Sequence, residues 1–489
     1  MFRIDRCTRA LLLATGAAVP FLMAGCEVTT LAVTTTVDEL NADGDCSLRE
    51  AIRAANLDAA VDACRAGDGD DTITLGAGTF RLTVTGQREQ EGLAGDLDIL
   101  GSVTIKGAGS GQTILDGNRT ERIIDVFAPA AVTISDLSIR NGLASPGRRG
   151  GGIVVLSGSA LTLRNTVVEG NATADGPDLI PDGGGIYNNG TLVVVDSIIR
   201  NNTAGGLDGS GGGFWSSGTL TLTRSTVSGN RAVGSDPVAH AIDGGGGIFS
   251  SGTLTMTGST ISGNTASYRA GGLGNTGTAN VSTSTFNANL GLSGGAIHNT
   301  SALTVVNTTL SGNSAMASGG GAFSLSGSAT LASVTVAGNV ADSDGNGSGN
   351  GGGISVAGGT ALVRSSILAT NQDLGGQAPD CANPGTIQSQ GYDRFGSLTG
   401  CVISGVTTGN QVGGNSLLGP LGDNGGPTQT RALLAGSPAI DAGNPAPPGS
   451  GGTACPAVDQ RAVSRPQDGN GDSAARCDIG AYERRPNGT

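Results

Sequence analysis

The chain between Gly151 and Asn371 is built from one repeated unit. Two copies read GGGFWSSGTLTLTRSTVSGN (211–230) and GGGIFSSGTLTMTGSTISGN (245–264). Each copy has a glycine cluster, a bulky apolar residue, an alternating Thr/Leu run and a closing asparagine. A unit this short cannot bury its apolar face alone, so consecutive units are expected to stack as a solenoid. The eight closing asparagines are Asn171, Asn202, Asn230, Asn264, Asn289, Asn313, Asn339 and Asn371.

Aligning the units places like residues one coil apart. The closing asparagines are at least 24 residues apart, which suits three short strands and three turns. The predicted fold is therefore all-β: a right-handed, single-stranded parallel β-helix with three sides, in which strands stack about 4.8 Å apart. Stacked asparagines are expected to pass amide hydrogen bonds from coil to coil. The first apolar row comprises Ile153, Ile186, Phe214, Ile248, Leu273, Ile297, Phe323 and Ile354.

Extra residues are inserted at one corner of the coil, between the closing asparagine and the next glycine cluster. These insertions are 172–182, 203–210, 231–243 and 340–350. Repeat proteins place variable loops on one face, which is often the binding face.

Net charge limits the partners of the chain. The formal net charge is −13, which argues against nucleic acid and anionic lipid as partners. An acidic surface is compatible with divalent cations or neutral glycans, and we expect a monomer that needs no cofactor.

Residues 1–25 have the pattern of an export signal. Arg3, Arg6 and Arg9 precede an apolar run that is too short to span a bilayer. The run ends in LMAGC (22–26), which resembles the bacterial lipobox. The resemblance implies lipidation of Cys26 and a place in the cell envelope, as an outer-membrane lipoprotein or at the extracellular surface. The lipid would then be the only membrane attachment, and ordinary signal cleavage is the alternative.

Six further cysteines form three local couples that flank the repeat. Six cysteines allow fifteen connectivities, but in an exported protein near neighbours are expected to pair as disulfides. The couples are Cys46–Cys64, Cys381–Cys401 and Cys455–Cys477.

The segment before the solenoid has two interpretations. Ser47 and Glu50 form a capping box, and Leu48, Ala51 and Ile52 then recur at helical spacing, which predicts a short helix over the first coil. The same stretch fits a calcium loop, although no entering helix precedes it. A second acidic string near the C-terminus also fits Ca²⁺, with polar turns as the alternative in both places. The candidate ligands are Glu39, Asn41, Asp43, Asp45 and Glu50, and then Asp468, Asn470 and Asp472.

Outward-facing aromatics on three consecutive coils form a candidate glycan site. If Ile186, Phe214 and Ile248 point inward, the residues that follow them, Tyr187, Trp215 and Phe249, point outward. Aromatic rings in such a row offer a platform on which sugar rings stack. The alternative is that the neighbouring loops cover the aromatics. Three aspartates enter beside the row, just before the glycine clusters: Asp182, Asp208 and Asp243.

Neither histidine is assigned a catalytic role. His298 is expected on the outer face, and His240 falls in a long loop.

Both ends of the chain resemble known modules. CSLREAIRAAN (46–56) is similar to the CSLREA domain of bacterial surface proteins, and GPLGDNGGPTQT (419–430), GSPAIDAG (436–443) and CDIGAYE (477–483) resemble the choice-of-anchor Q module. The middle resembles the β-helix repeats of the pectate lyase superfamily. The resulting domains are a signal peptide (1–25), an N-terminal cap (26–71), a β-helix (72–371) and an anchor-like region (372–489).

Function is less constrained than fold. The resemblance implies an exported, surface-attached protein, and we expect a non-catalytic binding or adhesion module, with glycans as candidate ligands. No catalytic residue is assigned, because the WiDH motif of pectate lyases and the NTD, GHG and RIK motifs of the related hydrolases are absent. The alternative is a polysaccharide lyase or glycoside hydrolase. Three or four carboxylates and an arginine in one groove would favour that alternative.

Overall fold

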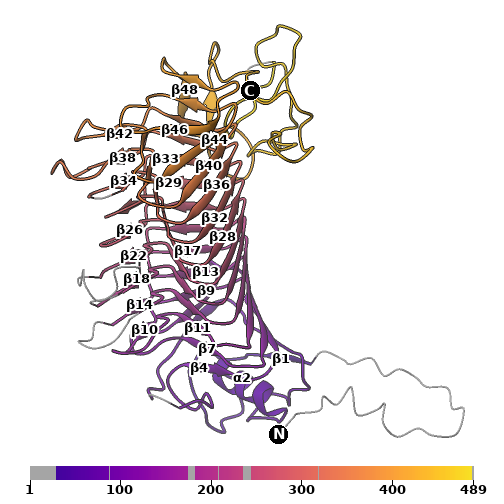
Figure 1. Cartoon of the computed structure of the whole chain (residues 1–489). Coiled ribbons are helices and arrows are strands. Elements are labelled where there is room, and N and C mark those ends of the chain that lie inside the picture. The colour runs from indigo at the N-terminus through magenta and orange to yellow at the C-terminus, as the bar shows by residue number, and fades with distance from the viewer. Residues whose placement is uncertain are drawn as a thin grey trace, which may run out of the picture.

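The computed structural model describes residues 29–86, 89–174, 182–206, 209–234, 244–317 and 319–486. The export signal, Cys26, Asp208, Asp243 and His240 lie outside these residues. Figure 1 shows a long stack of coils with helix α2 (Leu48–Leu57) near its N-terminal end and an irregular segment near its C-terminal end.

Helix α2 (Leu48–Leu57) closes the N-terminal end of the solenoid. The predicted capping box is present: the Glu50 amide donates to the Ser47 side chain, and the Glu50 carboxylate accepts from the Ser47 amide. Ala51 and Ile52 are buried in the main core. Arg49 is buried as well, and it forms an ion pair with Asp38 at 2.7 Å.

The described residues form four parallel sheets that run the length of the solenoid. Sheet I has 14 strands, sheet II has 13, sheet III has 11 and sheet IV has 9. One coil contributes one strand to each sheet in turn, for example β15 (Ile186–Asn188), β16 (Thr191–Val195), β17 (Ile198–Arg200) and β18 (Thr203–Ala204). The three long sides confirm the parallel solenoid, and the two-residue strands of sheet IV add a fourth strip after the asparagine turn.

Sheet I consists of β1 (Thr30–Ala32), β2 (Asp71–Thr74), β5 (Val103–Lys106), β8 (Ala131–Ser135), β12 (Ala160–Arg164), β16, β20 (Thr219–Thr223), β24 (Thr253–Thr257), β28 (Thr278–Ser282), β32 (Ala302–Val306), β36 (Ser328–Ala332), β40 (Thr360–Arg364), β44 (Thr386–Gln390) and β46 (Ile403–Val406). Sheet II consists of β3 (Gly78–Arg81), β6 (Thr113–Asp116), β9 (Ser138–Arg140), β13 (Val167–Glu169), β17, β21 (Thr226–Ser228), β25 (Thr260–Ser262), β29 (Thr285–Asn287), β33 (Thr309–Ser311), β37 (Thr335–Ala337), β41 (Ile367–Ala369), β45 (Arg394–Phe395) and β47 (Gln411–Val412).

Sheet III consists of β4 (Leu97–Ile99), β7 (Ile124–Val126), β11 (Ile153–Val155), β15, β19 (Phe214–Ser216), β23 (Ile248–Ser250), β27 (Leu273–Asn275), β31 (Ile297–Asn299), β35 (Phe323–Leu325), β39 (Ile354–Val356) and β43 (Cys381–Ala382). Sheet IV consists of β10 (Leu143–Ala144), β14 (Ala172–Thr173), β18, β22 (Arg231–Ala232), β26 (Thr265–Ala266), β30 (Leu290–Gly291), β34 (Ser314–Ala315), β38 (Val340–Ala341) and β42 (Gln372–Asp373). Strands therefore stack on both sides of the predicted boundaries at 72 and 371.

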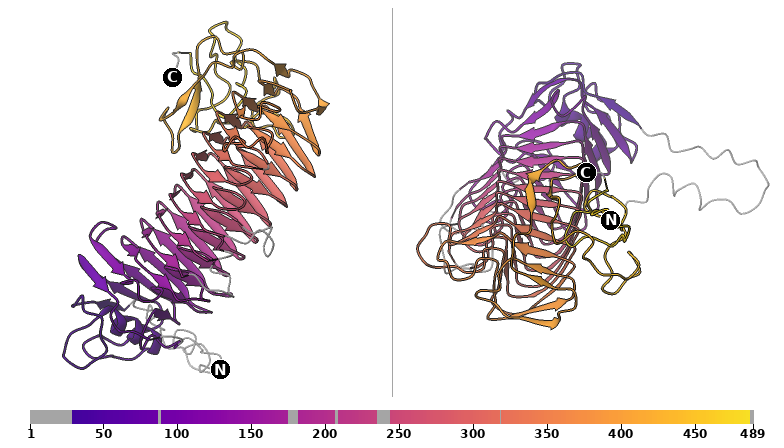
Figure 2. Two further views of the ribbon diagram at one scale, coloured as in Figure 1. Left: turned by 90° about the vertical axis from the view of Figure 1, so that its left-hand side faces the viewer. Right: turned by 90° about the horizontal axis from the view of Figure 1, so that it is seen from above.

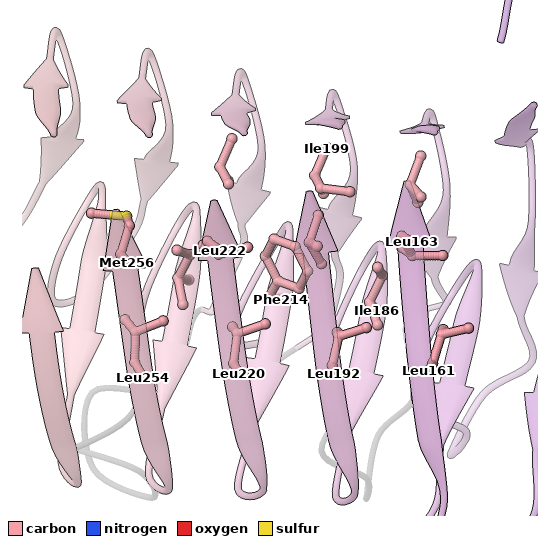
Figure 3. Close-up of a cluster of buried hydrophobic side chains, with 14 of the residues drawn as sticks. Leu161, Leu163, Ile186, Leu192, Ile199, Phe214, Leu220, Leu222, Leu254 and Met256 are labelled. Carbon is pink, nitrogen blue, oxygen red and sulfur yellow. The ribbon is translucent and has the colours of Figure 1, made fainter. Parts of the chain in front are cut away.

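The interior is a set of aliphatic rows, as the aligned repeat predicts. Leu192 pairs in register with Leu220 on the next coil, and Leu220 pairs with Leu254. Figure 3 shows these side chains pointing into the same interior as Ile186 and Phe214 from sheet III. All five residues have no exposed surface. Burying a side chain of this size stabilises the fold by about 1.5–3 kcal/mol.

The closing asparagines form a continuous buried ladder. From Asn171 to Asn371, each side-chain Nδ2 donates to the Oδ1 of the asparagine one coil further on, at 2.8–3.0 Å. The same Oδ1 also accepts the backbone N–H of the preceding asparagine. The ladder ends at Asp380, whose carboxylate accepts from Asn371 at 2.9 Å. These bonds satisfy buried backbone groups at the turn.

The C-terminal segment folds back along the outside of the solenoid. Gln460 donates from Nε2 to the backbone oxygen of Ser284 at 3.0 Å and accepts from the Thr309 hydroxyl at 2.7 Å. A second apolar cluster joins Ile367 of sheet II to Ile479 and Tyr482. Strands β48 (Leu418–Gly422) and β49 (Thr430–Leu433) form an antiparallel hairpin in this segment. Figure 2 shows the yellow segment beside the solenoid.

The three predicted cysteine couples are disulfides in the structure: Cys46–Cys64, Cys381–Cys401 and Cys455–Cys477. In the part of the chain that the structure describes, no helix has the length and apolar character needed to cross a membrane.

The asparagine ladder generates a stability prediction. Asn264→Ala removes a side chain that donates to Val227 and Asn289 and accepts from Asn230. Leaving buried polar groups without partners costs about 1–3 kcal/mol each, so we expect a loss of at least about 2 kcal/mol in unfolding free energy. Denaturant titration followed by circular dichroism measures it. The matched control, Asn280→Ala, alters an exposed asparagine of β28 and should change little. Equal effects of the two variants would contradict a stabilising ladder.

Candidate functional site

One row of residues runs along the outer face of sheet III. Each strand contributes its middle residue, and parallel pairing holds these residues in register from coil to coil. Because neighbouring strands lie about 4.8 Å apart, residues that are distant in sequence become neighbours in the row. From β4 to β31 the row reads Asp98, Asp125, Val154, Tyr187, Trp215, Phe249, Gly274 and His298.

The three predicted aromatics are brought together in this row. The rings of Tyr187 and Trp215 stack with centroids 4.6 Å apart and planes within 10°. Phe249 follows with its centroid 5.9 Å from Trp215 and a tilt of 31°. Offset stacking at such distances is a favourable arrangement of aromatic rings. The sequence pattern thus placed all three on the correct face.

The row is not the open platform that the glycan hypothesis describes. Tyr187 is 4% exposed and Phe249 is 2% exposed, and only Trp215 is half-buried. Arg149 lies over the first two rings, with its guanidinium carbon 5.0 Å from the Tyr187 centroid and 5.8 Å from the Trp215 centroid. It also donates to the Tyr187 hydroxyl at 2.6 Å. Alternation reveals the face of a strand, but it does not reveal what covers that face.

A cavity of about 530 Å³ opens on the N-terminal side of the aromatics. It lies over β7, β11 and β15, so the same row that carries the aromatics forms its floor. Charged, aromatic and aliphatic side chains share its walls: Gln90, Arg122, Asp125, Phe127, Gly147, Arg148, Arg149, Val154, Leu156, Tyr187 and Asn189. A second hollow of about 400 Å³ adjoins it, since Asn189 lines both.

Carboxylates and arginines cluster at one end of the cavity. Carboxylate oxygens of Asp96, Asp98 and Asp125 lie within 4.8 Å of one another. Arg122 forms ion pairs with Asp96 at 2.8 Å and with Asp125. Arg148 lies 3.8 Å from Asp96. The three aspartates are buried, and buried carboxylates at such separations repel one another unless cations or protons compensate.

Burial changes the protonation of two of these carboxyls. It raises the pKa of Asp98 to about 8, and the charge of Asp96 adds to the shift. Burial also raises the pKa of Asp125 to about 7, although the Arg122 guanidinium opposes the rise. Asp98 accepts one hydrogen bond from the Gly92 amide at 2.9 Å. Two carboxyls that titrate near neutral pH are able to give or take a proton there.

Asp182 belongs to the same site. Its carboxylate lies 3.7 Å from the guanidinium of Arg149, and its backbone oxygen accepts from the Gly150 amide. Asp182 therefore helps to hold the arginine that covers Tyr187. The other two loop aspartates of the prediction, Asp208 and Asp243, lie outside the described residues.

His298 lies on the expected face but is not a surface residue. It is 2% exposed, and its Nε2 lies 3.0 Å from Nη1 of Arg269. Burial, together with the Arg269 charge, lowers the pKa of His298 to about 3. The imidazole is therefore neutral at physiological pH. The outward direction of His298 is as expected, and the side chain is buried on that face because the loop before β27 brings Arg269 against it.

The predicted calcium loops have specific geometry. Glu39, Asp43 and Asp45 have carboxylate oxygens within 4.8 Å of one another. Asn41 donates to both Glu39 and Asp43, and the two carboxylate oxygens of Glu50 accept from the amides of Asn41 and Ser47.

In the second string the carboxylate of Asp468 accepts from the backbone amides of residues 471–473. Asn470 donates to Asp472 at 3.1 Å. The alternative of Asx-rich turns describes these hydrogen bonds, and Ca²⁺ stays a prediction at both places.

The carboxylate–arginine cluster was missed at the sequence level, although a signal exists. Asp98 stands between Leu97 and Ile99, and Asp125 stands between Ile124 and Val126. An aspartate between two inward-facing core residues points outward. Because Asp98 and Asp125 do so on consecutive coils, they must lie in one outer row. The positions of Arg122, Arg148 and Arg149 follow from turns between strands, for which the repeat gives no register.

Comparison with known proteins identifies the fold of part of the chain. The family model described as a right-handed β-helix region matches residues 101–242. Among solved structures, the crystal structure of pectate lyase Pel9A is similar, with 14% sequence identity and a TM-score of 0.35 over 94% of this chain and 98% of that chain. No curated protein matches the chain.

The raised pKa of Asp98 predicts a pH-dependent stability. The folded protein keeps a proton on Asp98 that the unfolded chain releases above about pH 4. The unfolding free energy therefore falls as pH rises from about 4 to about 8. Asp98→Asn should make this fall shallower, measured by thermal unfolding at pH 5 and pH 8. The control Asp344→Asn changes an exposed aspartate and should leave the slope unchanged. An identical slope in wild type and Asp98→Asn would contradict a buried protonated carboxyl.

Proposed function

We propose that the protein binds a polysaccharide chain in the cavity on the outer face of sheet III. The observation that carries the proposal is the continuity of this cavity with the stacked Tyr187–Trp215 pair. Sugar rings pack against aromatic faces, and their hydroxyls need donors and acceptors in the same place. Asp125, Arg148 and Asn189 supply both around the cavity. Small-ligand sites combine apolar walls with a few convergent polar groups in this way.

The proposal places the protein outside the cytoplasm. Three disulfides support an exported protein, since such bonds persist in oxidising compartments. The lipobox-like Cys26, the CSLREA-like segment 46–56 and the anchor-like region 419–483 are consistent with attachment at the cell surface. In this proposal the protein is a binding or adhesion module whose ligand occupies the cavity on sheet III.

Cleavage of the polysaccharide is a second candidate. Asp96, Asp98 and Asp125 lie together with Arg122 and Arg148 at the end of the groove, which is the combination of carboxylates and arginine that favours an enzyme. Asp125 and both arginines line the cavity. A carboxylate cluster of this kind is suited to hold Ca²⁺ or to exchange a proton with a bound sugar.

Polysaccharide binding can be followed by the fluorescence of Trp215, which is the single tryptophan of the chain. Titration with soluble polysaccharides should change its fluorescence if they occupy the groove. Trp215→Ala should weaken binding by up to about tenfold, from the loss of about 0.5–1.5 kcal/mol of ring packing. Trp215→Phe should retain most of the affinity. Calorimetry compares the variants, with Tyr392→Ala as the control at the far end of the solenoid. Unchanged binding in Trp215→Ala would exclude the groove.

Catalysis is tested separately with Asp125→Asn. If the cluster cleaves the chain, wild type should release unsaturated products or reducing ends, and the variant should lose at least about tenfold of this rate while still binding. Assays with added Ca²⁺ and with EDTA show whether the reaction needs a cation. Melting curves verify that the variant is folded. Absence of product from every polysaccharide that binds to wild type would leave a binding protein only.

A further inference from the structure

The two ends of the solenoid differ in how they are closed. At the N-terminal end, helix α2 places Ala51 and Ile52 over the core. At the C-terminal end, β46 is the last strand of sheet I and β47 is the last strand of sheet II. In the described chain each of them has a paired strand on one side only. The other edge of β46 and β47 is therefore free to accept a strand.

The last coil also exposes apolar side chains. Val402 is 76% exposed, Val406 is 54% exposed and Val412 is 57% exposed. Ile403, beside them, is partly buried against the core. The view from above in Figure 2 shows the C-terminal segment to one side of the orange strands. Apolar side chains beside a free strand edge mark an interaction surface.

The lack of charged residues in the last coil favours a second copy of this chain as the partner. Residues 395–422 contain no Asp, Glu, Lys or Arg, although the chain as a whole has a net charge of −13. Exposed strand edges of monomeric proteins are protected by lysine, proline, inward charges, bulges or short length. Strands β46 and β47 contain no lysine, proline or charged residue, and short length, four and two residues, is the protection that they have. Two acidic copies repel one another over most of their surfaces, but they can meet at this uncharged end without such repulsion.

We propose that the last coil is the interface of a homodimer in which two copies meet end to end. Strand β46 of one copy pairs antiparallel with β46 of the other about a two-fold axis, and the exposed valines pack between the copies. A two-fold contact uses the same surface on both copies and closes on itself. Helix α2 covers core residues at the N-terminal end, but in the described chain β1 also has a paired strand on one side only, so the mass in solution must distinguish a closed dimer from head-to-tail stacking. This inference replaces the monomer expected from the sequence, and it does not depend on the groove.

The test is the mass of the full chain in solution. Sedimentation velocity at micromolar concentration should give a species near twice 47.7 kDa. Val406→Lys adds an ammonium to each copy of the pairing strand, so the dimer should dissociate at least about tenfold more readily, because the charges repel and must be desolvated. The control Val37→Lys alters a valine that is 55% exposed near the N-terminal end and should remain dimeric. Unchanged melting of the Val406→Lys chain verifies its fold.

A second variant tests the geometry of the contact. Ser404→Cys places a thiol on the exposed part of β46, and mild oxidation should link two copies through it. Val37→Cys, near the opposite end, should not produce this link. A wild-type monomer at 100 micromolar would overturn the proposal. So would a Val406→Lys dimer as stable as wild type, equal cross-linking of both cysteine variants, or a mass that grows continuously with concentration.

Discussion

The buried asparagine ladder is the constraint on which the rest of the solenoid depends. Each coil turns sharply at its asparagine, and the turn leaves backbone groups inside the protein that no regular strand can pair. The next asparagine supplies the missing acceptor through its Oδ1, while its own Nδ2 donates further along the stack. One residue per coil therefore fixes the corner, and the strands on either side of that corner are held in a common register. The aliphatic rows are then stacked in register.

That register also creates the candidate site. The first inner position of sheet III is apolar on every coil, whereas the second is a buried asparagine or serine on five consecutive coils: Asn188, Ser216, Ser250, Asn275 and Asn299. The outer positions vary from Asp98 through Tyr187 to His298, and stacking places these acidic, aromatic and basic side chains in one row. The loops complete it: Arg149 reaches over the aromatics, and Arg269 buries His298. The candidate site is thus formed by the outer row together with the corner loops.

The sequence predicts the parts of the structure that depend on periodicity. The parallel solenoid, the asparagine ladder, the α2 capping box and the inward or outward direction of Tyr187, Trp215 and Phe249 all follow from spacing. Exposure does not follow, because it depends on loops whose path the repeat does not define. Tyr187 is covered by an arginine 38 residues earlier in the chain. The same alternation predicts that Asp98 and Asp125 point outward on neighbouring coils, since each stands between two core residues. Alternation does not predict the positions of the arginines in this cluster, because they lie in turns.

Asp380 ends the asparagine ladder. Every asparagine both donates and accepts, so the hydrogen-bond chain has a direction and continues as long as asparagines follow. Asp380 accepts from Asn371 but, when ionised, has nothing to donate. If a coil between Asn171 and Asn371 were duplicated, Asp380 would still end the ladder. The asparagine of the added coil would bond to the asparagines of the coils before and after it. The number of coils is accordingly free to change during evolution, whereas the two ends of the rod are each encoded once.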